Sequence, residues 1–257
     1  MQTKYPIMLV HGIILKDSRI FKSFGKIGDK LKAQGYCVYI GNHDGFGTIE
    51  NNAAQLKVQI EDILKKENAE KVNLIAHSKG GLDCKYLIRE LNMEDKVASL
   101  TTLCTPHKGS PVASKIMKLP KFILKFVAFW INLWYRIFGD KHPDSYNVCK
   151  QLQQHDEEDK FPFSDKVYCQ SFSTTIKKAK DDFVMGIPFI FSRFIQKSET
   201  DGLVPINSAI FENYRGNCFS ESFSHSQIVD FMTPKKKREQ IYSFYLAICK
   251  ELADMNL

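Results

Sequence analysis

Short apolar runs alternate with amphipathic stretches through the first hundred residues of the chain. The runs are β-branched or aromatic, are bounded by Gly, Pro, His or Asn, and span residues 7–10, 36–40, 72–76 and 98–104. Brief runs of this kind predict buried strands. Between them, apolar residues recur at helical spacing at Phe21, Phe24, Ile27 and Leu31, and again at Ala53, Leu56, Ile60, Ile63 and Leu64. Strands that alternate with helices predict an α/β fold, with a mostly parallel central sheet and helices on both faces.

The alternation stops in the segment 111–160. Its centre, residues 121–138, is aromatic and aliphatic, but Lys125 and Arg136 leave only ten uncharged residues between them. A membrane-spanning helix needs roughly 20 predominantly apolar residues. We therefore interpret residues 111–160 as an amphipathic helical insertion that forms a lid or cap on the core, with an ordinary core helix as the alternative.

The remainder of the chain predicts two further elements. Residues 166–172 are typical of a strand, and a closing helix is indicated by the spacing of Ile241, Phe244, Tyr245, Ile248 and Leu252. No internal repeat or low-complexity tract divides the sequence. Residues 1–257 are therefore expected to form a single domain that carries the insertion.

Composition agrees with one large globular unit. Of the 257 residues, 44% are hydrophobic and 25% are charged. A chain of this size buries roughly three quarters of its extended surface, so it needs no disulfides or metals to hold a core. The 7 cysteines are odd in number and contain no CxxC pair, which fits neither a disulfide framework nor a zinc site. A reducing compartment is the simpler interpretation.

The start of the sequence bears on localisation. No signal-peptide pattern lies between Met1 and the first expected strand. We therefore expect a cytoplasmic protein that associates with a membrane surface if the insertion binds lipid. Secretion is the alternative, if a signal peptide has been trimmed.

The excess of positive charge gathers in the insertion. Lys and Arg number 36 against 29 Asp and Glu, which gives a net charge of +7. Between residues 112 and 141, Asp140 stands against six basic residues, namely Lys115, Lys118, Lys121, Lys125, Arg136 and Lys141. Basic residues mixed with aromatic and aliphatic ones are typical of a lipid or membrane surface. The basic tract 235–238 is expected to be a solvated face, so no nucleic-acid partner is expected, and no pattern indicates an oligomeric state.

The run from residue 71 to residue 81 carries the most informative chemistry. It predicts a buried strand that ends at Ser78 and is followed by a helix. A serine hydroxyl is a weak nucleophile unless a sharp strand-to-helix turn holds it exposed beside a base. Such a turn requires small residues two positions before and after the serine, and Ala76 and Gly80 supply them. We predict that Ser78 is a nucleophile, with an ordinary loop serine as the alternative.

An acyl-transfer site also needs N–H donors for a tetrahedral oxyanion. One would be the N–H of Lys79, at the start of the helix, where the dipole also favours negative charge. The other would be the N–H of Ile13, because Gly12 lets the chain turn back over the serine after the first strand. His11 is expected to be a turn residue that bonds backbone, without a role in proton transfer.

A base and an acid are sought farther along the chain. If the order is serine, acid, histidine, only His225 lies in the final hundred residues, so we predict that it is the base. His77 is expected to be structural. The acid candidates are Asp140, Asp144, Asp156, Asp159, Asp165, Asp181, Asp182 and Asp201. Asp201 is favoured because it stands on a tight turn beside an apolar patch, within one connection of His225; a plain Asp-Gly turn is the alternative.

Four runs together resemble a known family. They read PIMLVHG at 6–12, VNLIAHSKGG at 72–81, TPHKGSPV at 105–112 and TDGLV at 200–204, with His225 after them. In this order they resemble the bacterial triacylglycerol lipases of the α/β-hydrolase fold, over nearly the whole chain. The sequence departs from the more frequent pattern in having alanine in place of the first glycine of the serine motif.

The resemblance implies a role for each candidate. Ser78 would be the nucleophile, Asp201 the acid and His225 the base. The N–H groups of Ile13 and Lys79 would form the oxyanion hole. The insertion would take the place of the family's lid, a helical flap that opens at a lipid–water interface.

The resemblance also raises the question of a structural calcium, which many relatives hold through two aspartates. Asp181 lies where the first would fall, but the second position is Gln227, with Asp230 as a nearby substitute. A calcium ion needs several oxygen ligands. A structural calcium is therefore doubtful, and we expect neither a metal nor a cofactor.

These observations lead to one expected function and two alternatives. We expect a serine carboxylic-ester hydrolase that acts on acyl glycerols or other lipid esters through a Ser-His-Asp triad and an acyl-enzyme. A phospholipid or thioester acyl hydrolase would use the same triad. A non-catalytic peripheral membrane protein would keep the α/β core as a scaffold and use the insertion as an anchor.

Overall fold

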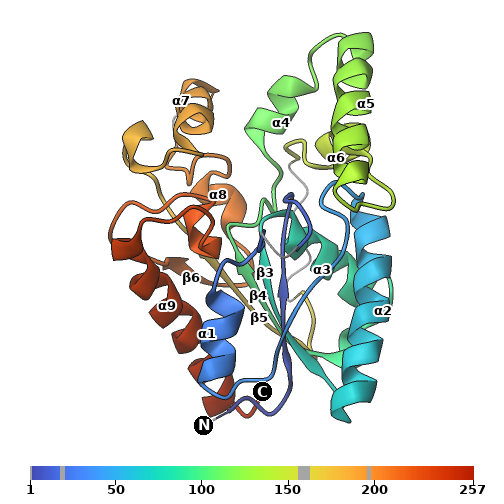
Figure 1. Ribbon diagram of the computed structural model, residues 1–257, viewed down its shortest axis with the longest axis vertical. Helices are drawn as coiled ribbons and strands as arrows, with labels where there is room; N and C mark the ends of the chain where they lie inside the picture. Colours follow the sequence, from blue (N-terminus) through green and yellow to red (C-terminus); the bar gives the residue numbers. More distant parts are fainter. Residues whose placement is uncertain (1, 18–20, 156–162, 196–197) are drawn as a thin grey trace.

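A six-stranded parallel sheet forms the centre of the molecule (Figure 1). The computed structural model describes residues 2–17, 21–155, 163–195 and 198–257. The strand order is β2-β1-β3-β4-β5-β6, and each neighbouring pair is parallel. The strands are β1 (Ile7–Val10), β2 (Val38–Ile40), β3 (Val72–His77), β4 (Val97–Leu103), β5 (Tyr168–Ser173) and β6 (Asn213–Asn217). The predicted α/β fold with a parallel sheet is confirmed.

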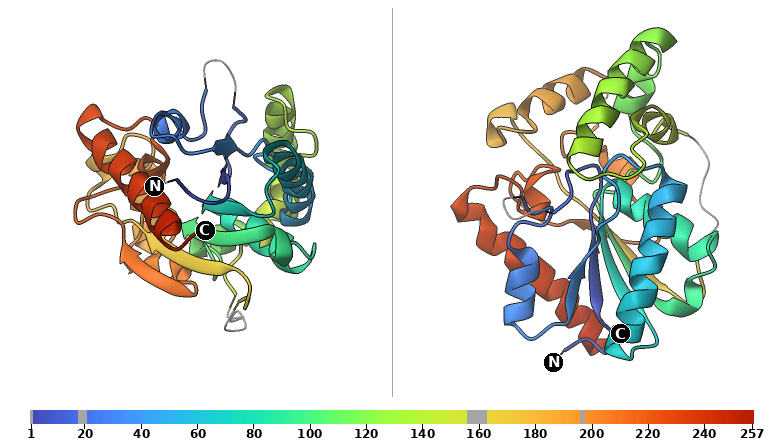
Figure 2. Two further views of the ribbon diagram at one scale, coloured as in Figure 1. Left: turned by 90° about the horizontal axis from the view of Figure 1, so that it is seen from below. Right: turned by 45° about the vertical axis from the view of Figure 1, so that its right-hand side comes forward.

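Helices cover both faces of the sheet (Figures 1 and 2). The helices α2 (Ile49–Glu67) and α3 (Lys79–Arg89) pack on one face, and α1 (Ile27–Ala33) and α9 (Lys235–Asp254) pack on the other. Side chains of β1 alternate between the two hydrophobic clusters, Met8 on the first and Ile7 on the second. Because both faces of the sheet are buried at β1, all four of its residues are apolar and do not alternate with polar ones.

The helix α2 shows how the sequence fixes its own limits. The hydroxyl of Thr48 accepts a hydrogen bond from Asn51 N at the start, and Asn68 ends the helix with a left-handed φ of 49°. All five residues of the predicted apolar stripe are buried. The stripe predicted from Phe21 to Leu31 is helical only from Ile27 onward, because the backbone leaves the helical region just before it, at Gly25.

The carboxyl ends of the strands meet at one edge of the sheet, and further helices stand over this edge (Figure 1). Between β4 and β5, the chain forms α4 (Pro111–Ile116), α5 (Lys121–Ile137) and α6 (Ser145–Gln151), which we call the α4–α6 segment. Beyond β5 lie α7 (Gly186–Ile195) and the short α8 (Ile206–Ala209). The 3-10 turns are Glu94–Lys96, Ala179–Asp181 and Gln227–Val229. The last part of the predicted insertion, residues 156–160, lies outside the described residues.

Two buried carboxylates fasten the end of α5 to the core in reciprocal fashion. Asp140, just after α5, accepts hydrogen bonds from Gly45 N and Phe46 N at 3.0 and 2.9 Å. Asp44, in the core, accepts from the backbone of residues 141 and 142, both at 2.8 Å. Lys16 adds an ion pair to Asp44 at 2.7 Å. The foot of α5 is therefore held by charge-assisted hydrogen bonds from both sides.

The outer part of α5 projects a broad apolar surface into solvent. Phe122 and Phe126 are 75% and 65% exposed, and of the helix only Ala128 is buried. On α7, Phe194 is 88% exposed. No helix within the described part of the chain is both long and apolar enough to cross a bilayer. The apolar surface therefore lies on helices that stand on the sheet edge.

Candidate active site

Ser78 occupies a strained turn between β3 and α3. Its φ of 55° and ψ of −133° lie outside the regions that ordinary residues prefer. A Cβ atom at Gly80 would lie 2.4 Å from the carbonyl oxygen of His11, and one at Gly12 would lie 2.7 Å from Ser78 Cβ. Both positions therefore require glycine, as the small-residue pattern predicted for Gly80. The turn is further held by Ser78 N, which donates to Leu103 O at 2.9 Å.

The structure brings the three predicted catalytic side chains together. Nε2 of His225 lies 2.8 Å from Ser78 Oγ, and Nδ1 lies 2.6 Å from Asp201 Oδ2. In a neutral imidazole, Nδ1–H would donate to the carboxylate and leave Nε2 to accept the serine proton. The other oxygen of Asp201 accepts from Leu203 N and Val204 N, at 2.9 and 2.7 Å, so the carboxylate is fixed in place.

The other acid candidates lie elsewhere or serve the backbone. Asp140 belongs to the foot of α5, Asp144 caps α6 by accepting from Asn147 N, and Asp165 is exposed. Asp156 and Asp159 lie outside the described residues. Asp181 accepts from Lys178 N.

Asp182 is a buried residue beside the histidine whose role the sequence did not reveal. One carboxylate oxygen accepts from the hydroxyls of Ser224 and Ser226, the two neighbours of His225. The other oxygen accepts from the backbone of Val184 and Met185, at 2.6 and 2.8 Å. The only sequence signal was a serine on each side of the histidine.

Ile13 and Lys79, the two predicted oxyanion-hole residues, lie on segments that meet near the serine. Ile13 follows Gly12 and lines the same cavity as Ser78, while Lys79 is the first residue of α3. A Cβ atom at Gly12 would lie 3.1 Å from Lys79 N, so the loop after β1 reaches the start of α3. The oxyanion hole formed by the N–H groups of Ile13 and Lys79 stays a prediction, and the approach of the two segments is what it requires.

The side chain of Lys79 points into the core. Its ammonium lies 2.7 Å from Asp83 Oδ1, and both side chains are buried. Asp83 also accepts from Asn52 Nδ2 at 3.0 Å. Burial raises the pKa of Asp83 to about 6, against the opposing effect of the Lys79 ammonium.

Three further histidines pack around the site. His11 Nδ1 lies 2.9 Å from Gly12 O, and its ring stacks on His43 with centroids 3.9 Å apart. His77 lies against His225, with centroids 4.5 Å apart. Burial lowers the pKa of His11 to about 4 and the pKa values of His43 and His77 well below their ordinary value. These imidazoles are therefore neutral at physiological pH and are part of the packed core.

Cys104 approaches the same site from the end of β4. Its Sγ, a carboxylate oxygen of Asp201 and a ring nitrogen of His225 all lie within 4.8 Å of one another. Within the described ranges, this is the only group of three or more His, Cys, Asp or Glu side chains that converges in this way. Burial raises the pKa of the Cys104 thiol well above its ordinary value, so it is a thiol and not a thiolate. Its hydrogen-bond partner is Thr174 Oγ1, at 3.3 Å.

Ser78 and His225 open into an apolar cavity of about 480 Å³. Its walls come from the loop after β1, from the α4–α6 segment and from the loops that precede α7 and α8, and include Ile13, Val112, Ile116, Leu152, Met185 and Leu203. Sites for small organic ligands occupy roughly 300–1,000 Å³ and are lined mostly by apolar side chains. The cavity therefore has the size and the lining of a site for a small apolar ligand beside the serine.

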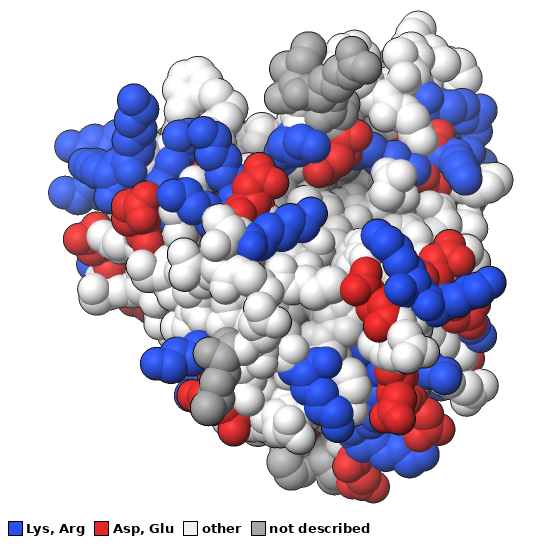
Figure 3. Space-filling model, turned by 60° about the horizontal axis from the view of Figure 1, so that its bottom comes forward, with Lys and Arg blue, Asp and Glu red and all other residues white. Residues whose placement is uncertain are grey.

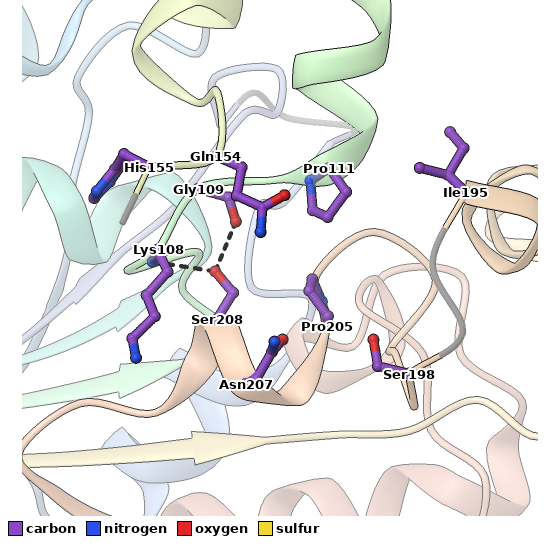
Figure 4. A pocket seen from close by; sticks show the side chains of 10 residues that line it. All are labelled: Lys108, Gly109, Pro111, Gln154, His155, Ile195, Ser198, Pro205, Asn207 and Ser208. Carbon is purple, nitrogen blue, oxygen red and sulfur yellow. Dashed lines mark hydrogen bonds between the residues drawn. The ribbon is translucent and has the colours of Figure 1, made fainter. Parts of the chain in front are cut away.

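A second cavity, of about 450 Å³, lies between the start of α4, the end of α7 and α8, and Ser78 is not among its lining residues (Figure 4). Lys108, His155 and Asn207 give it a polar lining. Ser208 joins α8 to the loop before α4, since its hydroxyl accepts a hydrogen bond from Lys108 N and donates one to Gly109 O. Lys108 and Gly109 of the TPHKGS run thus line this cavity, whereas Pro106 and Ser110 of the same run line the apolar cavity together with Ser78 and His225.

Comparison with known proteins places this geometry in a family. Residues 6–162, more than half of the chain, match the family described as palmitoyl protein thioesterase. The chain belongs to this family. In this member of the palmitoyl protein thioesterase family, the matched span runs from β1 to beyond α6, and so includes Ser78 and the α4–α6 segment.

Curated relatives are named as lipases. Triacylglycerol lipase 2 of Saccharomyces cerevisiae is 28% identical over 87% of this chain and 71% of its own length. Triacylglycerol lipases of Pseudarthrobacter phenanthrenivorans and Vibrio cholerae are 35% and 38% identical, over 59% and 45% of this chain. The alignments cover 50% and 36% of those two bacterial proteins, so the chain matches half of their length or less. The predicted resemblance to triacylglycerol lipases is confirmed.

Solved structures share the fold. The mature Bacillus licheniformis lipase BlEst2 superposes with a TM-score of 0.65 at 22% identity, over 93% of this chain and 92% of its own. The metagenomic carboxyl esterase MGS0156 superposes with a TM-score of 0.73 at 14% identity, over the whole of this chain and 77% of its own. The predicted α/β-hydrolase fold is therefore confirmed.

Proposed function

We propose that this protein is a serine hydrolase of lipid carboxylic esters, with acyl glycerols as the substrate class. The observation that carries the proposal is the hydrogen-bonded series from Asp201 through His225 to Ser78, at 2.6 and 2.8 Å, at the wall of an apolar cavity. An activated serine beside such a cavity is the arrangement that acyl transfer from a lipid ester requires. Lipase relatives support the same conclusion.

In the proposed mechanism, Ser78 Oγ attacks the acyl carbonyl carbon while His225 Nε2 takes its proton. The N–H groups of Ile13 and Lys79 stabilise the oxyanion of the tetrahedral intermediate. The intermediate collapses when His225 returns the proton to the departing alkoxide, which leaves an acyl-serine. Water, deprotonated by His225, then attacks the acyl-serine to form a second tetrahedral intermediate. Its collapse releases the fatty acid, and His225 returns the proton to Ser78 Oγ.

We further propose that the α4–α6 segment is a lid that meets a lipid–water surface. Exposed Phe122 and Phe126 on α5 lie near Lys118, Lys121 and Lys125 in the sequence, which combines apolar area with charge for anionic headgroups. On the face of the molecule shown in Figure 3, basic side chains gather at the upper left with a few acidic ones among them, and the two signs are mixed at the lower right. The exposed aromatic side chains of α5, together with its lysines, are the feature that supports contact with lipid through that end of the molecule.

The nucleophile is tested by intact-mass spectrometry after incubation with a long-chain p-nitrophenyl phosphonate. Wild-type protein should gain one adduct, and Ser78→Ala should gain none. Ser114→Ala, which removes a hydroxyl from α4, is the matched control and should be labelled like the wild type. An unlabelled wild type, or a labelled Ser78→Ala, would remove the serine from its proposed role.

The lid is tested by comparing soluble and emulsified esters. Phe122→Asp and Phe126→Asp together should lower hydrolysis of an emulsified triacylglycerol about tenfold or more, because burial of one phenyl group contributes roughly 1.5–3 kcal/mol. Hydrolysis of a soluble short-chain ester should not change. The control is Val58→Asp on α2, an exposed apolar residue far from the cavity. Equal losses on both substrates would argue against a lipid-binding surface.

The family description favours one second candidate, hydrolysis of acyl thioesters. The same triad would serve, but a thiolate leaves more readily than an alkoxide, because thiol pKa values lie near 8.5. Measuring kcat/KM for a palmitoyl thioester and a palmitoyl oxygen ester of matched headgroup separates the two. A clear preference for the thioester would replace the ester as the proposed substrate.

A further inference from the structure

The loop that carries His225 is bound by an ammonium group from α9. Lys237, in the first turn of that helix, is buried, and its Nζ donates to Ser222 O and to Gln227 Oε1. The same nitrogen lies 4.7 Å from the centre of the Phe223 ring, within the range of a cation–π contact. The ammonium thus binds the loop on both sides of the histidine.

Gln227 connects this contact to the segment before α7. It is 1% exposed, and its Nε2 donates to Asp181 O at 2.9 Å. One residue farther on, Asp182 accepts from the serines on either side of His225. Burial lowers the pKa of Lys237, while the carboxylates of Asp181 and Asp182 oppose that shift and favour the ammonium. The loop, the segment and α9 are therefore joined through buried polar atoms.

The residues considered for calcium do not fit that ion. The Gln227 side-chain oxygen already accepts from Lys237, at 3.0 Å. The carboxylate of Asp230 faces the opposite way, where it accepts from Tyr242 OH at 2.8 Å and pairs with Arg238 at 3.1 Å. Asp181 is the one carboxylate of the set left for a cation that needs several oxygen ligands. The side-chain oxygen of Gln227, at the position of the second expected calcium ligand, is thus bonded to a positive group of the chain itself.

We propose that Lys237, together with Asp182, forms a metal-free clamp that positions His225, so that the site functions without a divalent cation. The ammonium supplies the positive charge between the 181–182 segment and the histidine loop. Two oxygens, Ser222 O and Gln227 Oε1, accept hydrogen bonds from it as they would bind a cation. The covalent link to α9 makes the presence of this positive group independent of any metal concentration. Lys237 is a positioning residue in this proposal, because it acts through the loop and not on the substrate.

The expected changes in kcat rest on the proposed function, whereas the expected changes in hydrogen exchange do not. The test therefore measures both activity and amide hydrogen exchange. Lys237→Met keeps an apolar side chain but removes the donors, and Lys237→Arg keeps donors. Lys236→Met, at the exposed neighbouring position of α9, is the matched control. Each variant and the wild type are assayed with a soluble ester in EDTA and in millimolar calcium, and amide exchange of residues 222–230 is followed under both conditions.

The wild type should show the same kcat and the same exchange in EDTA and in calcium. In Lys237→Met, the amide exchange rate of residues 222–230 should rise about tenfold. A hydrogen bond to a charged group stabilises the closed state of a loop enough for its loss to change the rate by about this factor. Its kcat should fall about tenfold or more with KM unchanged, because a small displacement of a catalytic group such as His225 lowers the rate of the chemical step by such a factor. Lys237→Arg should recover much of both, and Lys236→Met should match the wild type.

Three results would overturn the clamp. One is wild-type protein whose loop exchange slows, or whose kcat rises, when calcium replaces EDTA. Another is Lys237→Met that exchanges like Lys236→Met. The third is a kcat that stays at the wild-type value in Lys237→Met but falls in Lys237→Arg, which would show that only the packing of the side chain matters. The wild-type comparison needs no variant to fold, and the exchange readout holds even if no ester is hydrolysed, which would count against the proposed function alone.

Discussion

The ammonium of Lys79 lies 2.7 Å from the carboxylate of Asp83, one helical turn along α3, and both groups are buried. Lys79 is also the residue whose backbone N–H stands beside Ser78. A single residue therefore joins a buried ion pair to the proposed oxyanion hole. Burial of charge is costly unless the partner is in place.

Removing one partner of this pair should destabilise the fold strongly. Asp83→Asn leaves the buried ammonium without its counter-ion, and the free energy of unfolding should fall by about 3–5 kcal/mol. The double variant Lys79→Met, Asp83→Leu should recover most of this loss, because an apolar pair of similar size avoids both desolvation costs. Urea denaturation measures each value. Asp62→Asn, at an exposed position on α2, is the control, and an equal effect from it would contradict the role of burial.

Asp201→Asn should reduce kcat by a factor on the order of 10⁴, because an amide favours the wrong tautomer of His225. Folding should be little affected, since the asparagine oxygen can still accept from the two backbone N–H groups after Asp201. The measurement is ester turnover with circular dichroism as a check on the fold. Asp165→Asn, at an exposed acid candidate, should keep wild-type turnover. Activity retained in Asp201→Asn would reassign the acid.

Acid should destabilise the protein below pH 6.5. The pKa of His11 is lowered to about 4 by burial, and those of His43, His77 and His107 lie well below the ordinary value. Between pH 6.5 and about 4, the unfolded chain therefore binds more protons than the folded one, and stability falls as pH falls. Each histidine contributes a slope of about 1.4 kcal/mol per pH unit in this window. Asp83 and Asp140, whose pKa values are raised by burial, act in the opposite direction but are fewer than the four histidines.

His107 offers a way to measure one of these contributions. It is buried, stacks on Phe211 at 4.4 Å and bonds Thr102 Oγ1 at 3.1 Å. His107→Gln should cost stability at neutral pH through lost packing. Its free energy of unfolding should then fall less steeply between pH 6.5 and 5 than that of the wild type, by about 1.4 kcal/mol per pH unit. Parallel curves for the two proteins would show that His107 does not resist protonation.

The foot of α5 should loosen when Asp140 is truncated. Asp140→Ala leaves Gly45 N and Phe46 N without their acceptor, at a cost of about 2 kcal/mol. Amide exchange should increase in α5 and α6 and not in α2. Lys141→Ala is the control, because only the backbone of that residue bonds Asp44. Unchanged exchange in α5 would mean that the foot is held by other contacts.

The sequence allowed the central strands and the long helices to be predicted, because burial on both faces of a sheet leaves an apolar run. The predicted run 36–40 is a strand only from Val38, and β6 was not predicted. The reason for β6 is physical: its residues lie at the edge of the sheet and alternate between exposed and partly exposed positions. A strand whose side chains are hardly buried needs no hydrophobic pattern in its sequence, so it cannot be recognised from one.

The geometry of the site shows a similar division. The serine turn requires small residues at fixed positions, so Ser78 could be inferred from Ala76 and Gly80. Asp182 and Lys237 could not, because their contacts join segments that lie about 45 and 10 residues away along the chain. Hydrogen bonds between such segments do not require residues at fixed spacings, so no motif in the sequence indicates them. The structure alone reveals them.

The two ends of the α4–α6 segment meet in space. Ser110 and Gln153 pair as a parallel bridge, and Ser110 N donates to Leu152 O at 2.8 Å. The residues between them can thus be treated as one exchangeable insertion. Excising it and joining its neighbours by a short linker would not require the sheet to move. Grafting the corresponding stretch of a relative would make a chimera with the same triad. Sequence divergence within this insertion would let members of the family change the substrate that they recognise while the catalytic triad stays the same.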